Sequence, residues 1–359
     1  MRPIENDRFE WLQVLRAIAA LMVLFFHLNI YWSHVPGLAW LHPVLHWGFA
    51  GVDVFFVLSG FVVHHATREL RDGAALRKYA LRRAARIYLA YWPALILAIV
   101  IAQYVNDAPA PEPGVVWRSV LLIRQDLSKN LLPVAWSLTF ELYFYLLLGA
   151  LMLAPTRLQP QLILAVAAAI IGWNAWWLMT LRELVYSGNM PGRFLLNGYA
   201  IEFLAGALVS HFRHSNEADG RPSFTSDNAA HWVMGGICCA LMGLAIGTTA
   251  PQFDHIAFMR AATFGMVGLG GLLVALALQH TRWQAPTWLV RIGDSSYSLY
   301  LLHGPLLGVL ALLVPAAAQI SPSLAFPAAL SIPIVIVLIS YIWFKVLEAP
   351  SMRLARQLH

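Results

Sequence analysis

The chain has 359 residues, of which 59% are hydrophobic and 12% are charged, whereas soluble domains carry about 25% charged residues. So few charges cannot coat a soluble surface of this size, and the composition therefore indicates a polytopic membrane protein. The net charge of +6 is then explained by membrane topology, and no nucleic-acid partner is expected.

Ten apolar segments follow one another along the chain. Each is expected to be helical, because hydrocarbon offers no water to an open backbone and the segments are too long for barrel strands. Ten spans of about 22 residues use roughly 220 positions and leave no room for an appended soluble domain. We expect an all-α protein with a single integral-membrane domain over 1–359 and spans at 10–31, 44–66, 84–105, 131–153, 161–180, 194–212, 229–248, 256–279, 295–315 and 326–347.

The first span contains Arg16 and His27. An ionisable side chain inside a span costs about 3 kcal/mol, so each one is a candidate functional group. The two residues are eleven positions apart, which at 100° per residue is about 20° beyond three full turns, so they share one face about 16 Å apart along the axis. The alternative is an arginine that reaches back to the interface and a histidine bonded to a neighbouring carbonyl.

The second span contains Asp53, which could face His27. Residues with equal index sums lie level in adjacent antiparallel helices, and the pairs Asp53 with His27 and His64 with Arg16 have the same sum. A carboxylate in this place would orient the imidazole, as in a catalytic triad. Coincidence is the alternative, because the geometry of the Pro-containing connection at 32–45 is unknown.

A strongly basic segment separates the second and third spans. It holds seven basic residues from Arg68 to Arg86 and two acidic ones, which places it, and with it both termini, in the cytoplasm. Guanidinium groups and free backbone N–H groups at a helix start suit phosphate. We therefore expect Arg82, Arg83 and Arg86 to bind a phosphate-rich cytosolic ligand; the alternative is that they only set the topology.

Two further polar stripes have helical spacing. Ser137 and Glu141 share a face in the fourth span, where Glu141 either pairs with a buried arginine such as Arg16 or takes part in chemistry. Ser296, Tyr300 and His303 stand at i, i+4 and i+7, which suits either a polar seam between two spans or contact with substrate.

We assign no metal site. His42 and His46 have the spacing of metal ligands, but no acidic or thiol partner lies near them in the sequence.

Several segments together resemble the acyltransferase family 3 membrane proteins. They lie between residues 15 and 350 in the order found in that family. One departure is Gln13, where the family often has an acidic residue, so that Arg16 needs another partner, such as Glu141. The matching segments are 15–21 with His27, 51–61, Arg83 with Arg86, 136–138 with Glu141, Gly293 with 296–303, and 348–350.

The resemblance implies a ten-helix enzyme of the bacterial cytoplasmic (inner) membrane, surrounded by lipid. Such an enzyme transfers an acyl group, acetyl in most members, from cytosolic acyl-CoA to a hydroxyl of an extracytoplasmic glycan or lipid-linked sugar. In that family the arginine and histidine of the first span, here Arg16 and His27, are central to activity. The basic pair, here Arg83 and Arg86, is associated with CoA.

The residues and the resemblance together suggest a division of roles. We expect His27 to act as general base on the acceptor hydroxyl, although an acyl-histidine intermediate is left open. The oxyanion of the thioester has Arg16, Ser137 and Tyr297 as candidate stabilisers. The expected catalytic residues are His27, Arg16, Asp53 and Glu141, and the expected substrate contacts are Ser137, Trp136, Tyr297, Tyr300 and His303.

Two other functions compete with this interpretation. A secondary transporter also carries charges at the membrane midplane, but it would have helices broken at corresponding places in two halves, and the sequence shows no such correspondence. A non-catalytic scaffold of a polysaccharide assembly complex is the other alternative, and it would tolerate the loss of His27.

Overall fold

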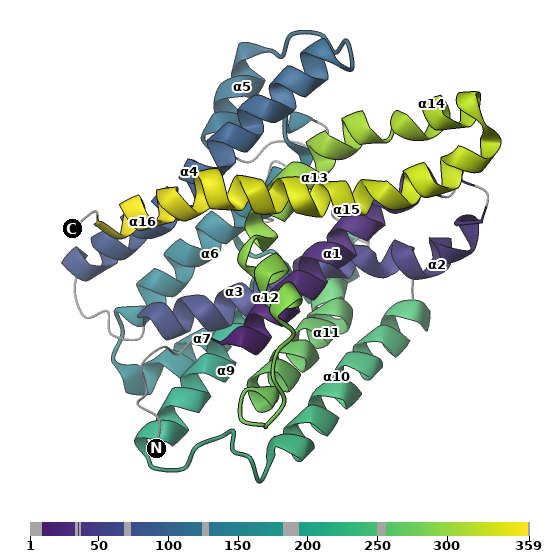
Figure 1. The fold of residues 1–359 in the computed structure, drawn as a ribbon. Helices are drawn as coiled ribbons and strands as arrows, with labels where there is room; N and C mark the ends of the chain where they lie inside the picture. Colours follow the sequence, from purple (N-terminus) through teal and green to yellow (C-terminus); the bar gives the residue numbers. More distant parts are fainter. Residues whose placement is uncertain are drawn as a thin grey trace.

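The computed structural model describes residues 9–32, 35, 37–67, 73–123, 129–181, 194–249 and 256–357. All regular structure within these residues is helical, as the composition predicts (Figure 1). The α-helices are α1 (Glu10–Trp32), α2 (His42–Leu45), α3 (Gly51–Thr67), α4 (Gly73–Tyr104), α5 (Pro113–Val120), α6 (Trp136–Met152), α7 (Gln159–Leu181), α9 (Tyr199–Ala218), α10 (Ala229–Thr249), α11 (Ala257–Leu278), α12 (Thr287–Asp294), α13 (Ser296–Leu310), α14 (Leu313–Ile320), α15 (Ala325–Trp343) and α16 (Ala349–Gln357).

Nine helical stretches of the described residues are long and apolar enough to cross a membrane, against ten predicted spans. The difference is the predicted span at 194–212, where the helix α9 begins later and ends later. Its second half is polar, because it contains His211, Arg213, His214 and Glu217. The chain is a multi-pass membrane protein, and α9 is its least apolar long helix.

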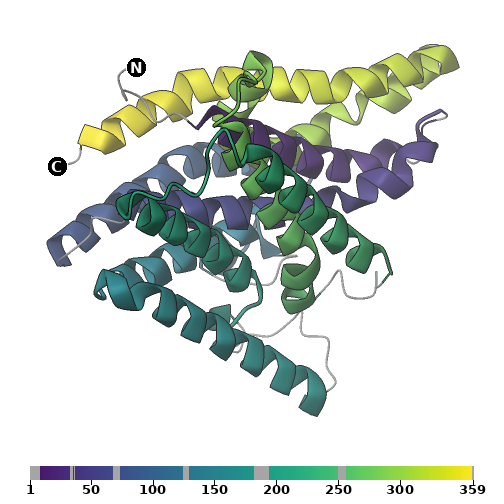
Figure 2. The same cartoon turned by 90° about the horizontal axis from the view of Figure 1, so that it is seen from below.

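Helix α1 lies in the middle of the assembly, where it contacts α3, α11, α12 and α13 (Figures 1 and 2). Two helix pairs pack beside it, α3 with α9 and α10 with α11. The polar stripe of α1 therefore faces protein on several sides. This position gives Arg16 and His27 partners from distant parts of the sequence.

Helices α3 and α9 approach each other closely at two glycines. A Cβ atom on Gly60 would lie 1.8 Å from the carbonyl oxygen of Phe203, and one on Gly206 would lie 1.9 Å from that of Val57. Membrane helices often use small residues in this way to bring their backbones together. The contact fixes α3, which carries Asp53 and Ser59, against a helix that is itself too polar to face lipid along its whole length.

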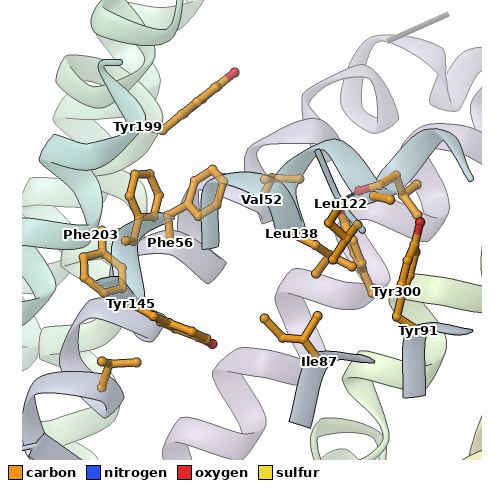
Figure 3. Close-up of a cluster of buried hydrophobic side chains, with 14 of the residues drawn as sticks. Val52, Phe56, Ile87, Tyr91, Leu122, Leu138, Tyr145, Tyr199, Phe203 and Tyr300 are labelled. Carbon is orange, nitrogen blue, oxygen red and sulfur yellow. Dashed lines mark hydrogen bonds between the residues drawn. The ribbon is translucent and has the colours of Figure 1, made fainter. Parts of the chain in front are cut away.

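A cluster of buried aromatic and aliphatic side chains joins α3, α4, α6, α9 and α13 (Figure 3). Phe56 and Phe203 lie in it on one side, and Ile87, Leu138 and Tyr300 lie in it on the other. Lipid tails are as apolar as these side chains, so the packing, and not the exclusion of water, holds the helices together here. The cluster sets the distance between the helices that carry the predicted site residues.

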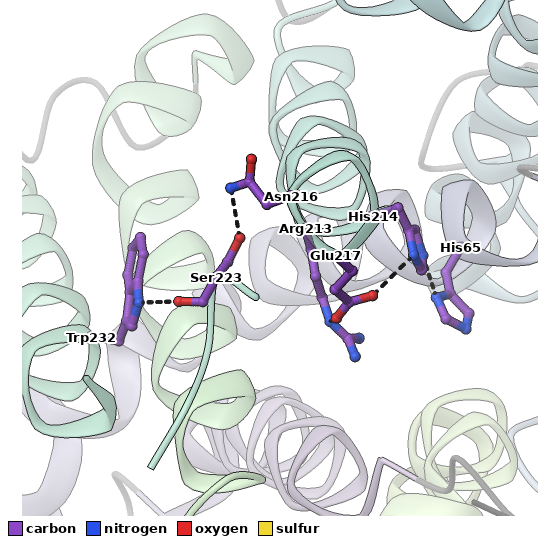
Figure 4. A network of polar contacts seen from close by, with 7 residues as sticks. All are labelled: His65, Arg213, His214, Asn216, Glu217, Ser223 and Trp232. Carbon is purple, nitrogen blue, oxygen red and sulfur yellow. Dashed lines mark hydrogen bonds and ion pairs between the residues drawn. The ribbon is translucent and has the colours of Figure 1, made fainter. Parts of the chain in front are cut away.

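A polar network joins α3 and α9 at their C-terminal ends (Figure 4). Nδ1 of His65 lies 2.8 Å from Nε2 of His214, and Arg213 binds Glu217 on the same helix through its Nε at 2.8 Å. The chain that follows α9 is held as well, because the carbonyl of Ser223 accepts a 2.8 Å hydrogen bond from Trp232 of α10. These contacts fix the ends of three helices at one edge of the protein.

The glycine contact gives a prediction about stability. Gly60→Ala should lower the melting temperature of the purified protein, although alanine is the better helix former, because the added methyl group collides with the backbone of α9. Gly172→Ala is the matched control: it is also inside a helix, but its Cβ would meet nothing within 4 Å. It should leave the melting temperature unchanged or raise it, and equal effects of the two variants would contradict the contact.

Candidate active site

Helices α1 and α13 run parallel and join at two polar contacts. Nε of Arg16 donates a hydrogen bond to Oγ of Ser296 at 3.2 Å. Farther along both helices, Nδ1 of His27 lies 3.3 Å from Nε2 of His303. The two stripes predicted from separate segments therefore face each other, and the shared face of Arg16 and His27 is confirmed.

The hydrogen bonds of His27 define which of its nitrogens carries the proton. Nδ1 lies 2.9 Å from the carbonyl oxygen of Val23, which can only accept, so Nδ1 carries hydrogen and Nε2 keeps a lone pair. By the same argument Nδ1 of His303 donates to the carbonyl of Leu299 at 3.2 Å, which leaves its Nε2 to accept from His27. The carbonyl contact that was the alternative explanation of His27 is present, and it leaves Nε2 suited to act as a base.

A cavity that is partly open to the outside lies next to this seam, and it has about 820 Å³ of space not filled by atoms when the open space at its mouth is included. Its wall comes from α1, α3, α4, α6 and α13. Three of the predicted stripes thus meet around one space. The predicted site residues that line it are Arg16, Arg83, Arg86, Ser137, Glu141, Tyr297 and Tyr300.

The other predicted site residues lie outside the cavity wall. His27 and His303 are close to Tyr300 of the wall, whose ring centroid is 5.8 Å from that of His303. Trp136 packs in an aromatic group with Phe56 and Tyr199, at centroid distances of 6.3 and 5.4 Å. The remaining two, Asp53 and Arg82, are described below.

Glu141 is the carboxylate of the cavity. It accepts a hydrogen bond from Ser59 at 3.2 Å and a short one from the hydroxyl of Tyr145 on the next turn of α6. Arg16 lines the same cavity and lies in its electrostatic range. The predicted pairing of the two is therefore at long range, and the described residues show no direct ion pair between them.

The arginines of α4 bind differently from the prediction. Helix α4 begins at Gly73, so Arg83 and Arg86 lie in the helix interior, where backbone N–H groups are already bonded. The predicted contribution of free N–H groups is wrong, and the guanidinium groups alone are left to bind an anion. That of Arg83 lies 5.3 Å from the ring centroid of Tyr145, a cation–π contact that holds it beside the cavity.

Arg82 does not belong to this group. It is exposed and is absent from the cavity wall. At 100° per residue it points about 90° away from the mean direction of Arg83, Arg86 and Ile87, which line the cavity. We therefore remove Arg82 from the predicted anion-binding residues.

Tyr297 and Tyr300 both direct their hydroxyls to main-chain carbonyls at the cavity wall. Tyr297 donates to the carbonyl of Ile87 at 3.2 Å. The hydroxyl of Tyr300 lies 3.0 Å from the carbonyl of Val134 and 2.7 Å from Oγ of Ser137. Tyr300 thereby links α13 to the start of α6.

Asp53 has a partner that the sequence did not identify. It is fully buried, and Arg260 of α11 binds it through both Nε, at 3.0 Å from Oδ1, and Nη2. The predicted contact of Asp53 with His27 is replaced by this pair. Glu202 of α9 is also buried and lies in the electrostatic range of both residues. Asp53 therefore joins α3 to α11 and has a structural position.

Four residues of this region were missed. Ser59 and Tyr145 line the cavity, and Glu348 accepts a 2.5 Å hydrogen bond from Ser298 within the electrostatic range of Arg16. Each of the four had a signal in the sequence. Ser59 and Glu348 belong to segments that match the family, Tyr145 continues the stripe of Ser137 and Glu141 by one turn, and Arg260 is an arginine inside the predicted span at 256–279. Asp53, the partner of Arg260, is 207 residues away in the sequence. Rules based on the spacing of residues within one helix cannot identify such a pair.

Comparisons with known proteins agree with the resemblance found in the sequence. The family model described as "Acyltransferase domain" matches residues 9–343. The chain is 24% identical over 339 residues to "Exopolysaccharide production protein ExoZ" of Rhizobium meliloti (strain 1021), covering 86% of this chain and 91% of that protein. It is also 24% identical over 327 residues to "Peptidoglycan O-acetyltransferase OatA" of Listeria monocytogenes, covering 82% of this chain and 48% of that protein. No solved structure matches.

The buried pair of Asp53 and Arg260 gives a second stability prediction. Arg260→Met should destabilise the protein by about 3–5 kcal/mol, because it leaves a buried carboxylate without its cation. Asp53→Asn combined with Arg260→Met should cost less than the two single changes added together. The measurement is thermal unfolding in detergent, with Arg291→Met at an exposed position as the control. Simple additivity would show that the two side chains are not coupled.

Proposed function

This chain belongs to the acyltransferase family whose model it matches over residues 9–343, and from that premise we propose that it is an O-acyltransferase acting across a membrane. The donor is acyl-CoA from the cytosol, with acetyl as the acyl group. The acceptor is a hydroxyl of an extracytoplasmic carbohydrate. The names of two relatives, an exopolysaccharide production protein and a peptidoglycan O-acetyltransferase, support a glycan acceptor. The basic segment from Arg68 to Arg86, most of which forms the first turns of α4, supports a cytoplasmic arginine end in the bacterial inner membrane.

The observation that carries the proposal is a cavity with arginines at one end and a histidine pair just beyond the other. CoA has a phosphate-rich nucleotide part and a thin thiol arm. Arg83 and Arg86 offer the planar, permanently charged donors that recognise phosphate. Arg16 lies deeper, where the thiol arm would pass, and the largely apolar α3 side of the cavity suits the uncharged part of that arm.

His27 would supply the proton transfer. Its Nε2 takes the proton of the acceptor hydroxyl while the hydroxyl oxygen attacks the thioester carbonyl. A C–O bond forms, the C–S bond breaks, and the proton passes from His27 to the departing thiolate. His303 and the carbonyl of Val23 hold the imidazole in the tautomer that this step needs. Arg16, Ser137 and Tyr297 remain the candidates for stabilising the oxyanion, since all three line the cavity.

The first test measures thioester cleavage and ester formation together. Purified protein in lipid discs receives acetyl-CoA labelled in the acetyl group and a mixture of surface glycans, and we expect labelled ester and free CoA in equal amounts. His27→Gln should lower the rate about 10²–10⁴-fold, the usual worth of a general base. His231→Gln, at an exposed position on α10, is the control and should retain the rate.

Two results would contradict the proposal. If no acyl-CoA is cleaved and vesicles containing the protein take up solute, the protein is a transporter. If glycans from cells with and without His27→Gln carry the same acyl groups by mass analysis, the histidine has no role in transfer.

The second test concerns the donor end. Arg83→Gln and Arg86→Gln should each raise the KM for acetyl-CoA about 10-fold or more, because each removes charge-assisted hydrogen bonds to phosphate. The KM for S-acetylpantetheine, which has no phosphate, should not change. Arg82→Gln should raise the KM for acetyl-CoA far less, and an equal effect at Arg82 would show that the cluster acts by general charge and not through the cavity.

A further inference from the structure

Tyr300 lies at the cavity wall, next to the histidine pair. Its side chain is 6% exposed and forms part of the wall. Its hydroxyl is held at two points, by Ser137 Oγ at 2.7 Å and by the carbonyl of Val134 at 3.0 Å. Phe55 of α3 packs edge-on against its ring at a centroid distance of 6.1 Å, so Tyr300 is fixed between α3, α6 and α13.

The histidine pair lies next to this ring and is not part of the cavity wall. His303 follows Tyr300 by one turn of α13 and is 1% exposed. His27 is next to it at 3.3 Å. Among the described residues that line the cavity, neither histidine is present, whereas Arg16, Ser296 and Tyr297 are. Tyr300 is thus next to both the cavity, whose wall it helps to form, and His303, the partner of the proposed base.

We propose that Tyr300 is a partition between the donor cavity and His27, tethered by Ser137 and Val134, and that it determines whether the acyl group reaches a carbohydrate hydroxyl or water. This inference rests on the proposed function. A thioester that meets water at an activated imidazole is hydrolysed: a C–O bond to water forms, the C–S bond breaks, and carboxylic acid and CoA thiol are released. A partition that opens with the acceptor in place prevents this loss.

The geometry explains why a tyrosine suits this task. Both of its tethers are neutral hydrogen bonds, which are weak enough to exchange for another partner. One of them leads to a side chain that lines the cavity, so a group arriving there can compete for Ser137. A phenylalanine would fill the same space without the tethers, which makes the hydroxyl separable from the ring by experiment.

The test measures the number of CoA molecules released for each ester formed. In the unchanged protein this ratio should be close to one, and acetyl-CoA should be stable when no glycan is added. Tyr300→Phe should raise glycan-independent CoA release about 5-fold, and Ser137→Ala, which removes one of the two tethers, should raise it less. Tyr91→Phe is the matched control: it removes a buried 2.8 Å hydrogen bond to the carbonyl of Ser119 away from the cavity, and the ratio should stay at one.

The possible results separate this inference from the proposed function. If Tyr300→Phe lowers ester formation and glycan-independent release by the same factor, Tyr300 acts in the chemistry itself and the partition is refuted. If neither rate changes, the hydroxyl has no such role. If the unchanged protein cleaves no acyl-CoA at all, the proposed function fails first. The melting temperature of each variant shows whether a change in the ratio comes from the site or from loss of the fold.

Discussion

The cost of placing charge in hydrocarbon governs this structure. Arginine, glutamate and histidine side chains within spans must turn toward protein or water, since lipid tails cannot bind them. Helices α1, α4, α6 and α13 meet this requirement by directing their polar stripes at one another. A cavity with a charged wall is the result, and the hydrophobic cluster beside it fixes the distances between the four helices (Figure 3). The same constraint acts a second time at Asp53 and Arg260, where the two charged side chains bind each other directly.

Much of this arrangement could be predicted from the sequence. Helical periodicity states which residues of one helix share a face, and it gave the right stripes at Arg16 with His27, Ser137 with Glu141, and Ser296 with Tyr300. It does not state which helix a stripe will meet. Asp53 was assigned to His27 because the two would lie level in adjacent antiparallel helices, but the helix that packs against α3 at that depth is α11, which brings Arg260 from 207 residues away. The start of α4 was missed for a related reason, since its first turns are polar and periodicity of apolar residues does not register them.

The geometry separates binding from proton transfer along one axis. Permanently charged groups lie at one end, where an anion needs a strong and fixed partner. Neutral hydrogen-bonding groups occupy the middle, and a pair of imidazoles held in defined tautomers lies beyond them. In each of these three places the residue type has the protonation state that its proposed role requires. The orientation, with the arginine end toward the cytosol, follows from the basic residues between Arg68 and Arg86 and stays a prediction.

The seam between α1 and α13 also bears on how the protein is made. Arg16 and Ser296 are 280 residues apart, so α1 leaves the ribosome long before α13. During that interval the guanidinium of the nascent chain lacks the hydroxyl that it contacts in the finished protein, and a chain that stops before α13 never gains it. The contact between α1 and α13 can therefore form only after α13 has been synthesised, and a chain that ends earlier keeps Arg16 without its hydroxyl partner.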